Sequence, residues 1–184
     1  MLNYYSEEQY IAELSLDGNI IGQIEKWKAH ENGILHKGFT IIIAYEDNIC
    51  LQSRKHPVFD GYIDMTISSH PLFLNDKLEE IENALFRTLL RECGLERFDI
   101  LKSEYIHTNT YKAKHDLYIE HEMCDFYFVR TKKRPMFFDE IAYGGIFLPI
   151  DKIISSPIKK SYAPWISKSL DENLYNSIKK CFYL

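Results

Sequence analysis

Alternation of apolar and polar residues predicts antiparallel strands in the first third of the chain. The pattern runs through residues 10–24 on both sides of Asp17-Gly18, a pair that favours a tight hairpin turn. A second pair of strand-like runs fills residues 39–54 and is interrupted by the polar turn 46–48. We therefore expect two hairpins that follow one another along the chain.

The segments next to these hairpins contain residues that break regular structure. Residues 25–38 are polar and irregular, which predicts a loop or a short helix. Residues 55–70 contain Pro57 and Gly61 and are followed by Pro71, so we expect a loop-rich segment there. Both segments contain histidines, the residue type that most often takes part in acid–base chemistry and metal binding.

One stretch in the middle of the chain has helical periodicity. Asp76, with Glu79 three residues later, has the pattern of a capping box, and Gly94 occupies the position at which glycine commonly ends a helix. Between them, apolar residues recur at steps of three and four: Leu78, Ile81, Leu85, Leu89 and Cys93. The pattern predicts an amphipathic helix that begins after Asp76 and ends before Gly94.

The remainder of the chain returns to strands and closes with a helix. Residues 98–108 and 117–130 read as strands, and residues 143–154 indicate a short strand followed by the beginning of a helix. Residues 167–184 have the pattern of an amphipathic helix. Many strands with few helices predict an α+β fold, a mixed β-sheet with helices on its faces. No repeat, linker or low-complexity segment divides the sequence, so we expect a single domain over residues 1–184.

Composition and charge restrict the class of protein. Hydrophobic residues make up 46% of the chain and charged residues 27%, as in ordinary globular proteins. The net charge of -5 argues against nucleic-acid binding by a broad basic face. The polar N-terminus lacks the apolar core of a signal peptide, and no apolar run reaches the roughly 20 residues of a membrane span. The four cysteines are scattered, without zinc-binding spacing, so we expect a reducing, cytoplasmic setting and no membrane partner.

Five residues of metal-binding types occur in suggestive positions: His30, His36, His70, Glu120 and Glu122. The two glutamates lie two residues apart on a predicted strand, so their carboxylates face the same side. Because burial of an unpaired carboxylate is costly, that face is either exposed to solvent or occupied by a cation. If the histidines converge on it, the five side chains form an octahedral site for Mn²⁺, Mg²⁺ or Zn²⁺. The alternative is a solvated strand face and histidines that cluster by chance.

Other residues have both a functional and a structural interpretation. Glu92, near the end of the predicted helix, is either a surface carboxylate or a ligand for Mg²⁺ on a phosphorylated substrate. Lys26, Arg54 and Lys55 are candidate phosphate-binding cations, or solvated charges. Trp165 is either part of the core or the wall of a pocket that faces a cation.

Seven short motifs occur in the order and spacing of one enzyme family. They are E-K-W-K-A-H (25–30), L-H-K-G-F (35–39), S-H-P-L (69–72), R-E-C-G-L (91–95), Y-K-A (111–113), E-H-E (120–122) and A-P-W (163–165). Through them the chain, from Asn19 to Lys168, resembles the type 1 isopentenyl-diphosphate isomerases of the Nudix-fold superfamily. The resemblance implies a Nudix-type mixed β-sheet sandwiched by helices.

The resemblance also implies a reaction and a role for each matching residue. The reaction interconverts isopentenyl and dimethylallyl diphosphate by metal-dependent protonation and deprotonation through a carbocation, with an isoprenoid diphosphate as the small-molecule partner. Glu122 and Tyr111 would act on one face of the alkene, and Trp165 would stabilise the carbocation through its π face. Glu92 would hold Mg²⁺ on the substrate diphosphate. The ligands of the divalent metal, Mn²⁺ or Zn²⁺, would be His30, His36, His70, Glu120 and Glu122.

Three features depart from the family pattern. Ser68 occupies the position of a cysteine that acts as an acid or base opposite the glutamate, and a hydroxyl exchanges protons far less readily than a thiol, whose pKa is about 8.5. Thr88 replaces an arginine that helps to bind the diphosphate. The loop from Lys55 to Gly61 is shorter than in the family, where a further basic anchor usually lies, and His56 is a candidate replacement.

These departures leave two functions open. In the first, the protein is an isomerase in which Glu122 and a water held by Ser68 transfer the protons. In the second, it keeps the fold and the metal but acts on another allylic or diphosphate substrate, or binds a ligand without turnover. A Nudix hydrolase is disfavoured, because Thr88 and Arg91 occupy positions of metal-binding glutamates in the hydrolase motif and only Glu92 is left.

Overall fold

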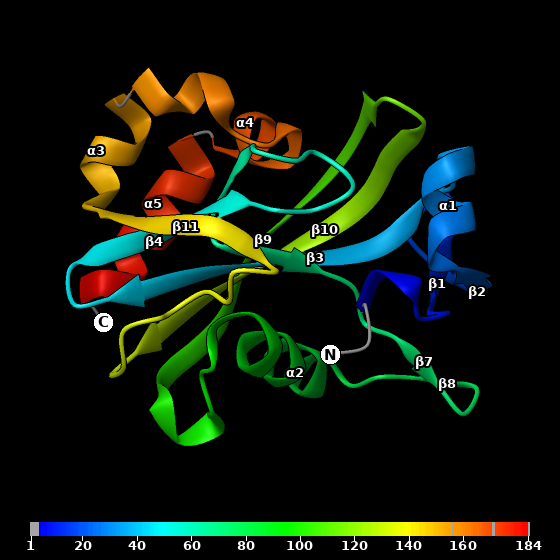
Figure 1. The fold of residues 1–184 in the computed structure, drawn as a ribbon, viewed down its shortest axis with the longest axis horizontal. Helices are drawn as coiled ribbons and strands as arrows, with labels where there is room; N and C mark the ends of the chain where they lie inside the picture. Colours follow the sequence, from blue (N-terminus) through cyan, green and yellow to red (C-terminus); the bar gives the residue numbers. More distant parts are fainter. Residues whose placement is uncertain (1–3, 156, 171, 184) are drawn as a thin grey trace.

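The structure is a computed structural model that describes residues 4–155, 157–170 and 172–183 (Figure 1). Its strands in chain order are β1 (Tyr10–Leu14), β2 (Ile20–Glu25), β3 (His36–Tyr45), β4 (Asn48–Arg54), β5 (Ile63–Asp64), β6 (Ile67–Ser69), β7 (Phe73–Leu74), β8 (Lys77–Leu78), β9 (Ile100–His115), β10 (Tyr118–Thr131) and β11 (Ala142–Leu148). Its α-helices are α1 (Lys26–Asn32), α2 (Ile81–Cys93), α3 (Ile150–Ser155), α4 (Pro164–Ser169) and α5 (Glu172–Tyr183). Short 3₁₀ turns cover Tyr4–Ser6, Arg97–Asp99 and Pro157–Ser161.

Within the described residues, nine strands form one mixed sheet. β3 pairs antiparallel with β1, β4 and β6, and parallel with β10. β2 pairs with β1, β11 and β5 with β4, and β9 with β10, all antiparallel. The short β7–β8 hairpin is a separate two-stranded sheet. The arrangement confirms the predicted α+β class and mixed sheet.

Helices cover both faces of this sheet (Figure 1). β3 is buried along nearly its whole length, as expected for a strand with a covered sheet on both sides. Ile41 and Ile43 pack with apolar side chains of α2 on one face. Ile42 and Ala44 face the other way, into a core that includes side chains of α3, α4 and α5. The predicted sandwich of helices around the sheet is therefore confirmed.

A split between β3 and β4 creates the position of the site. The two strands pair only next to their turn, at Ala44–Ile49 and Tyr45–Asn48. Farther from the turn, β6 pairs with β3 and β5 pairs with β4. The sheet is consequently opened near the beginning of β3, where side chains from its two faces can meet.

Both predicted N-terminal hairpins are confirmed, and the segments around them differ in detail. β1 and β2 flank a turn in which Gly18 has a φ of 82°, a conformation that glycine adopts without strain. Residues 25–38 contain α1 and the first residues of β3, and Glu25 caps α1 by accepting hydrogen bonds from two backbone N–H groups. Residues 55–70 are less loop-rich than predicted, because β5 forms there by pairing with β4 and β6 by pairing with β3.

The predicted start of the central helix is wrong, whereas its end is confirmed. α2 begins at Ile81, and Asp76 lies in the β7–β8 turn with a φ of 60°. Asn75 and Asp76 both have positive φ, which suits a tight hairpin turn. Asp76 therefore belongs to the turn and does not cap the helix. Glu79 binds Arg87 instead of completing a capping box. Gly94 ends the helix in the left-handed conformation, with a φ of 62°.

The C-terminal pattern also divides differently from the prediction. Residues 143–154 form β11 and most of α3, as the sequence indicates. The single helix predicted over residues 167–184 is instead the end of α4 followed by α5, and α4 ends at Ser169 with Leu170 as its C-cap. Positions 171 and 184 of that prediction lie outside the described residues.

Candidate metal centre and active site

Strand register brings the predicted metal ligands together. β10 runs parallel to β3 so that Glu122 lies directly beside His36. Glu120 shares the face of Glu122 because the two lie two residues apart on the strand. His30 comes from the last turn of α1, and His70 follows β6, whose Ser69 is paired with β3. These positions combine residues that are far apart in sequence.

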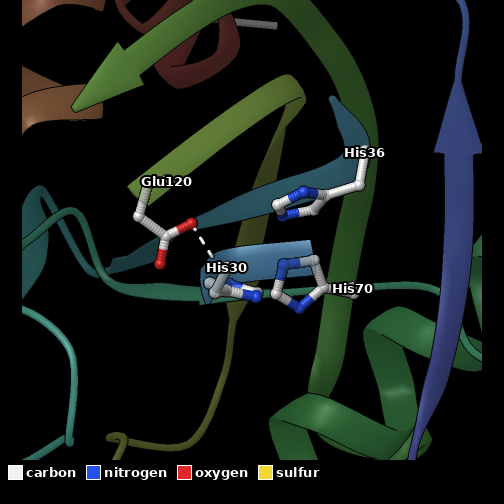
Figure 2. A group of neighbouring side chains, drawn as sticks. All are labelled: His30, His36, His70 and Glu120. Atoms are coloured by element: carbon white, nitrogen blue, oxygen red, sulfur yellow. Dashed lines mark ion pairs between the residues drawn. The ribbon is translucent and has the colours of Figure 1, made fainter. Parts of the chain in front are cut away.

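Three imidazoles and one carboxylate converge in a compact group (Figure 2). One ligand atom from each of four residues lies within 4.8 Å of every other: His30, His36, His70 and Glu120. The ring centroids of His30 and His36 are 4.8 Å apart, and the ring centroid of His70 lies 5.3 Å from that of His30 and 5.1 Å from that of His36. Such a group can hold a metal ion.

Hydrogen bonds to the backbone orient two of these histidines as metal ligands. Nδ1 of His30 lies 2.6 Å from the Lys26 carbonyl oxygen, and Nδ1 of His36 lies 2.8 Å from that of Ile34. A carbonyl oxygen only accepts, so each Nδ1 carries the hydrogen and each Nε2 of a neutral ring offers a lone pair. His36 Nε2 and Glu120 Oε2 are buried and make no hydrogen bond, but each has an ion-pair contact: His36 Nε2 with Glu122 Oε1 at 3.6 Å, and Glu120 Oε2 with His30 Nε2 at 3.3 Å. The donor set therefore fits a divalent cation such as Zn²⁺ or Mn²⁺.

Glu122 lies beside this group and links it to the rest of the site. Its Oε1 accepts a hydrogen bond from His70 Nε2 at 2.8 Å and lies 3.6 Å from His36 Nε2. Its Oε2 accepts a 2.5 Å hydrogen bond from the Tyr111 hydroxyl, because Tyr111 is its partner across β9 and β10. A methyl group on Gly38 would lie 2.6 Å from the Glu122 carboxylate, so the absence of a side chain there makes room for it.

The charges in this cluster shift the pKa values of its members. Burial lowers the pKa of His30, but interactions with the Glu120 carboxylate outweigh burial and raise it to about 9, so a metal ion at Nε2 would have to displace a proton. Burial lowers the pKa of His70 to about 4 despite its hydrogen bond with Glu122. Burial favours a higher pKa for Glu122, yet the adjacent imidazoles of His36 and His70 hold it well below its usual value. Burial and the Glu122 charge raise the pKa of Tyr111 well above 10, so its hydroxyl stays protonated.

A cavity lies against the cluster and gathers most of the predicted site residues. Besides His30, His70, Glu120 and Glu122, its lining includes six others named from the sequence: Lys26, Arg54, Ser68, Glu92, Tyr111 and Trp165. His56, the candidate basic anchor, also lines the cavity. Burial and the charge of Arg54 hold the pKa of His56 well below 6.5, which makes the ring neutral at pH 7. Lys55 is placed elsewhere: its Nζ donates to the Asp139 carbonyl oxygen and it does not line this cavity.

Ser68 has its hydroxyl tied into a chain of hydrogen bonds. Its Oγ lies 2.9 Å from Thr40 Oγ1, the residue paired with it across β3 and β6. Thr40 Oγ1 in turn lies 3.4 Å from the Cys124 thiol. Burial raises the pKa of this thiol well above its usual value, so it stays protonated. A serine hydroxyl thus faces the cavity, and a thiol lies two hydrogen bonds behind it.

Asp64 holds two residues of the cavity wall and was not found from the sequence. Its Oδ2 accepts a hydrogen bond from Arg54 at 2.8 Å, and its Oδ1 accepts one from Trp165 Nε1 at 2.9 Å. The Arg54 guanidinium carbon also lies 4.9 Å from the centre of the Trp165 ring. The available signal was a carboxylate between apolar residues in Y-I-D-M, which needs a partner if it is buried. Gln52 and Arg91, which line the same cavity, carried no signal that marked them as site residues.

Sequence comparison finds a relative of the type that the motifs indicate. No family model matches the chain. Isopentenyl-diphosphate delta-isomerase 2 of Homo sapiens is 30% identical over 139 residues, which cover 67% of this chain and 61% of that protein. The match therefore spans about three fifths of the relative's own length.

Comparison of structures identifies the fold. A Deinococcus radiodurans protein matches with a TM-score of 0.64 and 13% identity over 94% of this chain and 99% of its own. The MutT protein of Methanosarcina mazei Go1 matches with a TM-score of 0.57 and 9% identity, covering 82% of this chain and 96% of that one. A NUDIX hydrolase of Nitrosomonas europaea gives 0.52 and 13%, covering 78% and 88%.

The helices of the described residues are also informative. None of them is both long enough and apolar enough to cross a membrane.

The helix-covered mixed sheet and the sequence match to an isopentenyl-diphosphate isomerase both agree with the family that the seven motifs indicate. The chain is a Nudix-fold protein, and its resemblance to the type 1 isopentenyl-diphosphate isomerases is confirmed by this relationship.

Proposed function

We propose that the protein is an isomerase that interconverts isopentenyl and dimethylallyl diphosphate. One observation carries the proposal: the group of His30, His36, His70 and Glu120 adjoins a cavity whose lining also includes Trp165. The sequence relationship to an isopentenyl-diphosphate isomerase supports the same reaction. The substrate would be a small isoprenoid diphosphate.

The metal would be held by the three histidines, Glu120 and Glu122. Bound there, a divalent cation supplies fixed positive charge that keeps the carboxylates ionised and fixed in orientation. The buried atoms of His36 and Glu120 that lack hydrogen bonds support this assignment. Tyr111 donates its hydrogen bond to Glu122 Oε2 and so holds one oxygen of this carboxylate in place.

The reaction moves a double bond by adding one proton and removing another. A proton joins the terminal alkene carbon, a tertiary carbocation forms, and the adjacent CH₂ group loses a proton. Glu122 and Tyr111 would serve one face of the substrate, with Ser68 and a water held by it on the other. Trp165 is buried and its ring is oriented by Asp64, which suits a π face directed at a short-lived cation.

The diphosphate would be bound by the cations of the same cavity. Lys26 and Arg54 both line it, and each is held in position by a neighbouring oxygen. Lys55 lies outside the lining and contacts Asp139, so its contribution to binding would require a different side-chain conformation.

Ser68 supports a second candidate function. A hydroxyl in the position of the family's thiol is a poor acid or base, and Thr88 removes a cationic contact. Both differences favour slow turnover, a different allylic or diphosphate substrate, or binding without turnover. The structural likeness to Nudix hydrolases concerns the fold, and the hydrolase motif lacks two of its glutamates here.

Deuterium exchange tests the proposal directly. The protein loaded with Zn²⁺ or Mn²⁺ is incubated with isopentenyl diphosphate in D₂O, and product and recovered substrate are analysed by NMR. We expect dimethylallyl diphosphate that contains deuterium. The variant Glu122→Gln should lose this activity, whereas Glu82→Gln, which neutralises an exposed glutamate outside the cavity, should retain it.

The same experiment separates the two candidate functions. Absence of both exchange and isomerisation at high protein concentration would refute the isomerase. If isopentenyl diphosphate then still binds, as measured by calorimetry, the protein is a binder or acts on a related substrate. If it does not bind, the substrate class is wrong as well.

A further inference from the structure

The last turn of α2 presents an arginine and a glutamate to the cavity. Arg91 and Glu92 both line it, close to the split between β3 and β4. Glu92 is buried, and the Arg91 side chain is 21% exposed. Glu92 Oε1 accepts a hydrogen bond from the Arg91 guanidinium, and Glu92 Oε2 accepts one from Gln52 Nε2 at 3.3 Å.

These contacts do not fit a magnesium ion at Glu92. Mg²⁺ requires oxygen ligands at about 2.1 Å in near-octahedral geometry. Here, each carboxylate oxygen of Glu92 already faces an N–H donor, and one donor carries a full positive charge. A dication on this carboxylate would have to displace Gln52 and would be repelled by Arg91. Glu92 is therefore placed as the counter-ion of an arginine.

Arg91 is a cation on α2 that reaches the cavity. Thr88, three residues earlier on the same helix, is uncharged and completely buried. Residues three apart on a helix project from the same side, so Arg91 extends from the face of Thr88, about one turn along. A guanidinium offers five N–H donors in a planar fork that matches phosphate oxygens.

We propose that Arg91 binds the diphosphate directly, with the guanidinium held in place by Glu92, which is itself hydrogen-bonded to Gln52, and that this anchor does not depend on Mg²⁺ at Glu92. The inference rests on the proposed function for the nature of the substrate. Lys26 and Arg54 line the same cavity and add positive charge around the bound anion. Glu92 and Gln52 act as positioning residues, whereas Arg91 contacts the ligand.

Binding of inorganic pyrophosphate tests this anchor independently of isomerisation. Calorimetry is performed on the metal-loaded protein, without chelator, in buffers with and without Mg²⁺. We expect the wild-type protein to bind pyrophosphate in the buffer without Mg²⁺, and Arg91→Gln to weaken binding at least tenfold. Arg91→Lys should weaken it less, because the charge remains but the planar fork is lost.

Two further variants separate this anchor from effects of folding and net charge. Arg97→Gln removes an arginine that pairs with Glu82 outside the cavity, and it should bind pyrophosphate like the wild type. The double variant Arg91→Gln/Glu92→Gln avoids leaving a buried carboxylate without its partner and should show the same loss as Arg91→Gln.

Opposite results would overturn the inference. The first is wild-type binding of pyrophosphate only when Mg²⁺ is present. The second is pyrophosphate binding that Glu92→Gln loses and Arg91→Gln retains. The third is absence of pyrophosphate binding by the wild type. The calorimetry measures binding and not turnover, so its result can be interpreted even if the deuterium exchange experiment shows no isomerisation. Conversely, an active isomerase in which Arg91→Gln changes neither pyrophosphate affinity nor KM would refute the anchor and retain the proposed function.

Discussion

Replacement of Asp64 by alanine is expected to be one of the most damaging single changes in the cavity wall. The Asp64 side chain is completely buried and accepts three hydrogen bonds, from Arg54, from the Trp165 indole and from the Met65 backbone N–H. The Arg54 side chain is 7% exposed. Asp64→Ala thus leaves a buried cation without its carboxylate and an indole N–H without its acceptor.

The cost can be worked out from these contacts. Removal of one partner of a buried ion pair typically costs about 3–5 kcal/mol, and a buried N–H left unsatisfied costs about 1–3 kcal/mol. The two losses share one site and do not add fully, so we expect a decrease of about 4 kcal/mol in the free energy of unfolding. With a urea m-value of about 2 kcal/mol/M, the unfolding midpoint falls by about 2 M.

Equilibrium unfolding in urea, followed by circular dichroism, measures this decrease. Asp64→Asn keeps an acceptor for Trp165 and Met65 but loses the charge opposite Arg54, so it should cost less than Asp64→Ala. The double variant Arg54→Met/Asp64→Ala removes the stranded cation together with the carboxylate. Its cost should be at least 1 kcal/mol below the sum of the two single changes, within the usual range for contacting residues.

Two results would refute this reasoning. A loss below about 1 kcal/mol for Asp64→Ala would place the pair among weak, solvent-screened ion pairs, contrary to its burial. A strictly additive double variant would show that Arg54 and Asp64 do not depend on each other in the folded protein.

Three further predictions concern the metal centre, the opposite wall of the cavity and the cysteines. Gly38→Ala should lower the affinity for Zn²⁺ or Mn²⁺ at least tenfold in equilibrium dialysis, because the added methyl group would displace the Glu122 carboxylate; unchanged metal content would contradict the close contact. Ser68→Cys should raise isomerase activity at least tenfold, equivalent to about 1.4 kcal/mol off the barrier, measured as the initial rate of product formation; no increase would indicate a more widely altered cavity. The four buried cysteines should react slowly with a thiol reagent at pH 8 in the folded protein, and all four should react quickly in denaturant. The reason is that burial raises the pKa of Cys50 and of Cys181 to about 12 and leaves little reactive thiolate in the folded state. Rapid labelling of the native protein would argue against this burial.

Local sequence predicted those elements that neighbouring residues determine. The hairpin at Asp17-Gly18, the central helix and its end at Gly94 follow from turn chemistry and periodicity, and all three are confirmed. The start of the helix was misplaced because Asp76 suits both a cap and a hairpin turn, and the pairing of β7 with β8 decided between them. β5 and β6 were missed since each is short and is defined by its partner strand.

Spacing alone left the metal site open, and the family resemblance singled out its residues. The sequence could show that Glu120 and Glu122 share one face of a strand, because that depends on the period of a strand alone. It could not show that His36 lies beside Glu122, since this follows from the parallel register of β3 and β10. The structure brings four of the five proposed ligands into one group. The fifth, Glu122, lies beside the group and accepts a hydrogen bond from His70.

The sequence by itself determined the α+β class, the hairpins, the central helix and the set of residue types able to bind a metal and a diphosphate. Only the tertiary structure decided that Glu92 faces Arg91 and Gln52, that Asp64 joins Arg54 to Trp165, and that Lys55 lies outside the cavity. The physical reason is the range of the interactions. Periodicity and turn preferences act over a few residues, whereas a buried charge is defined by whichever distant side chain the fold places beside it.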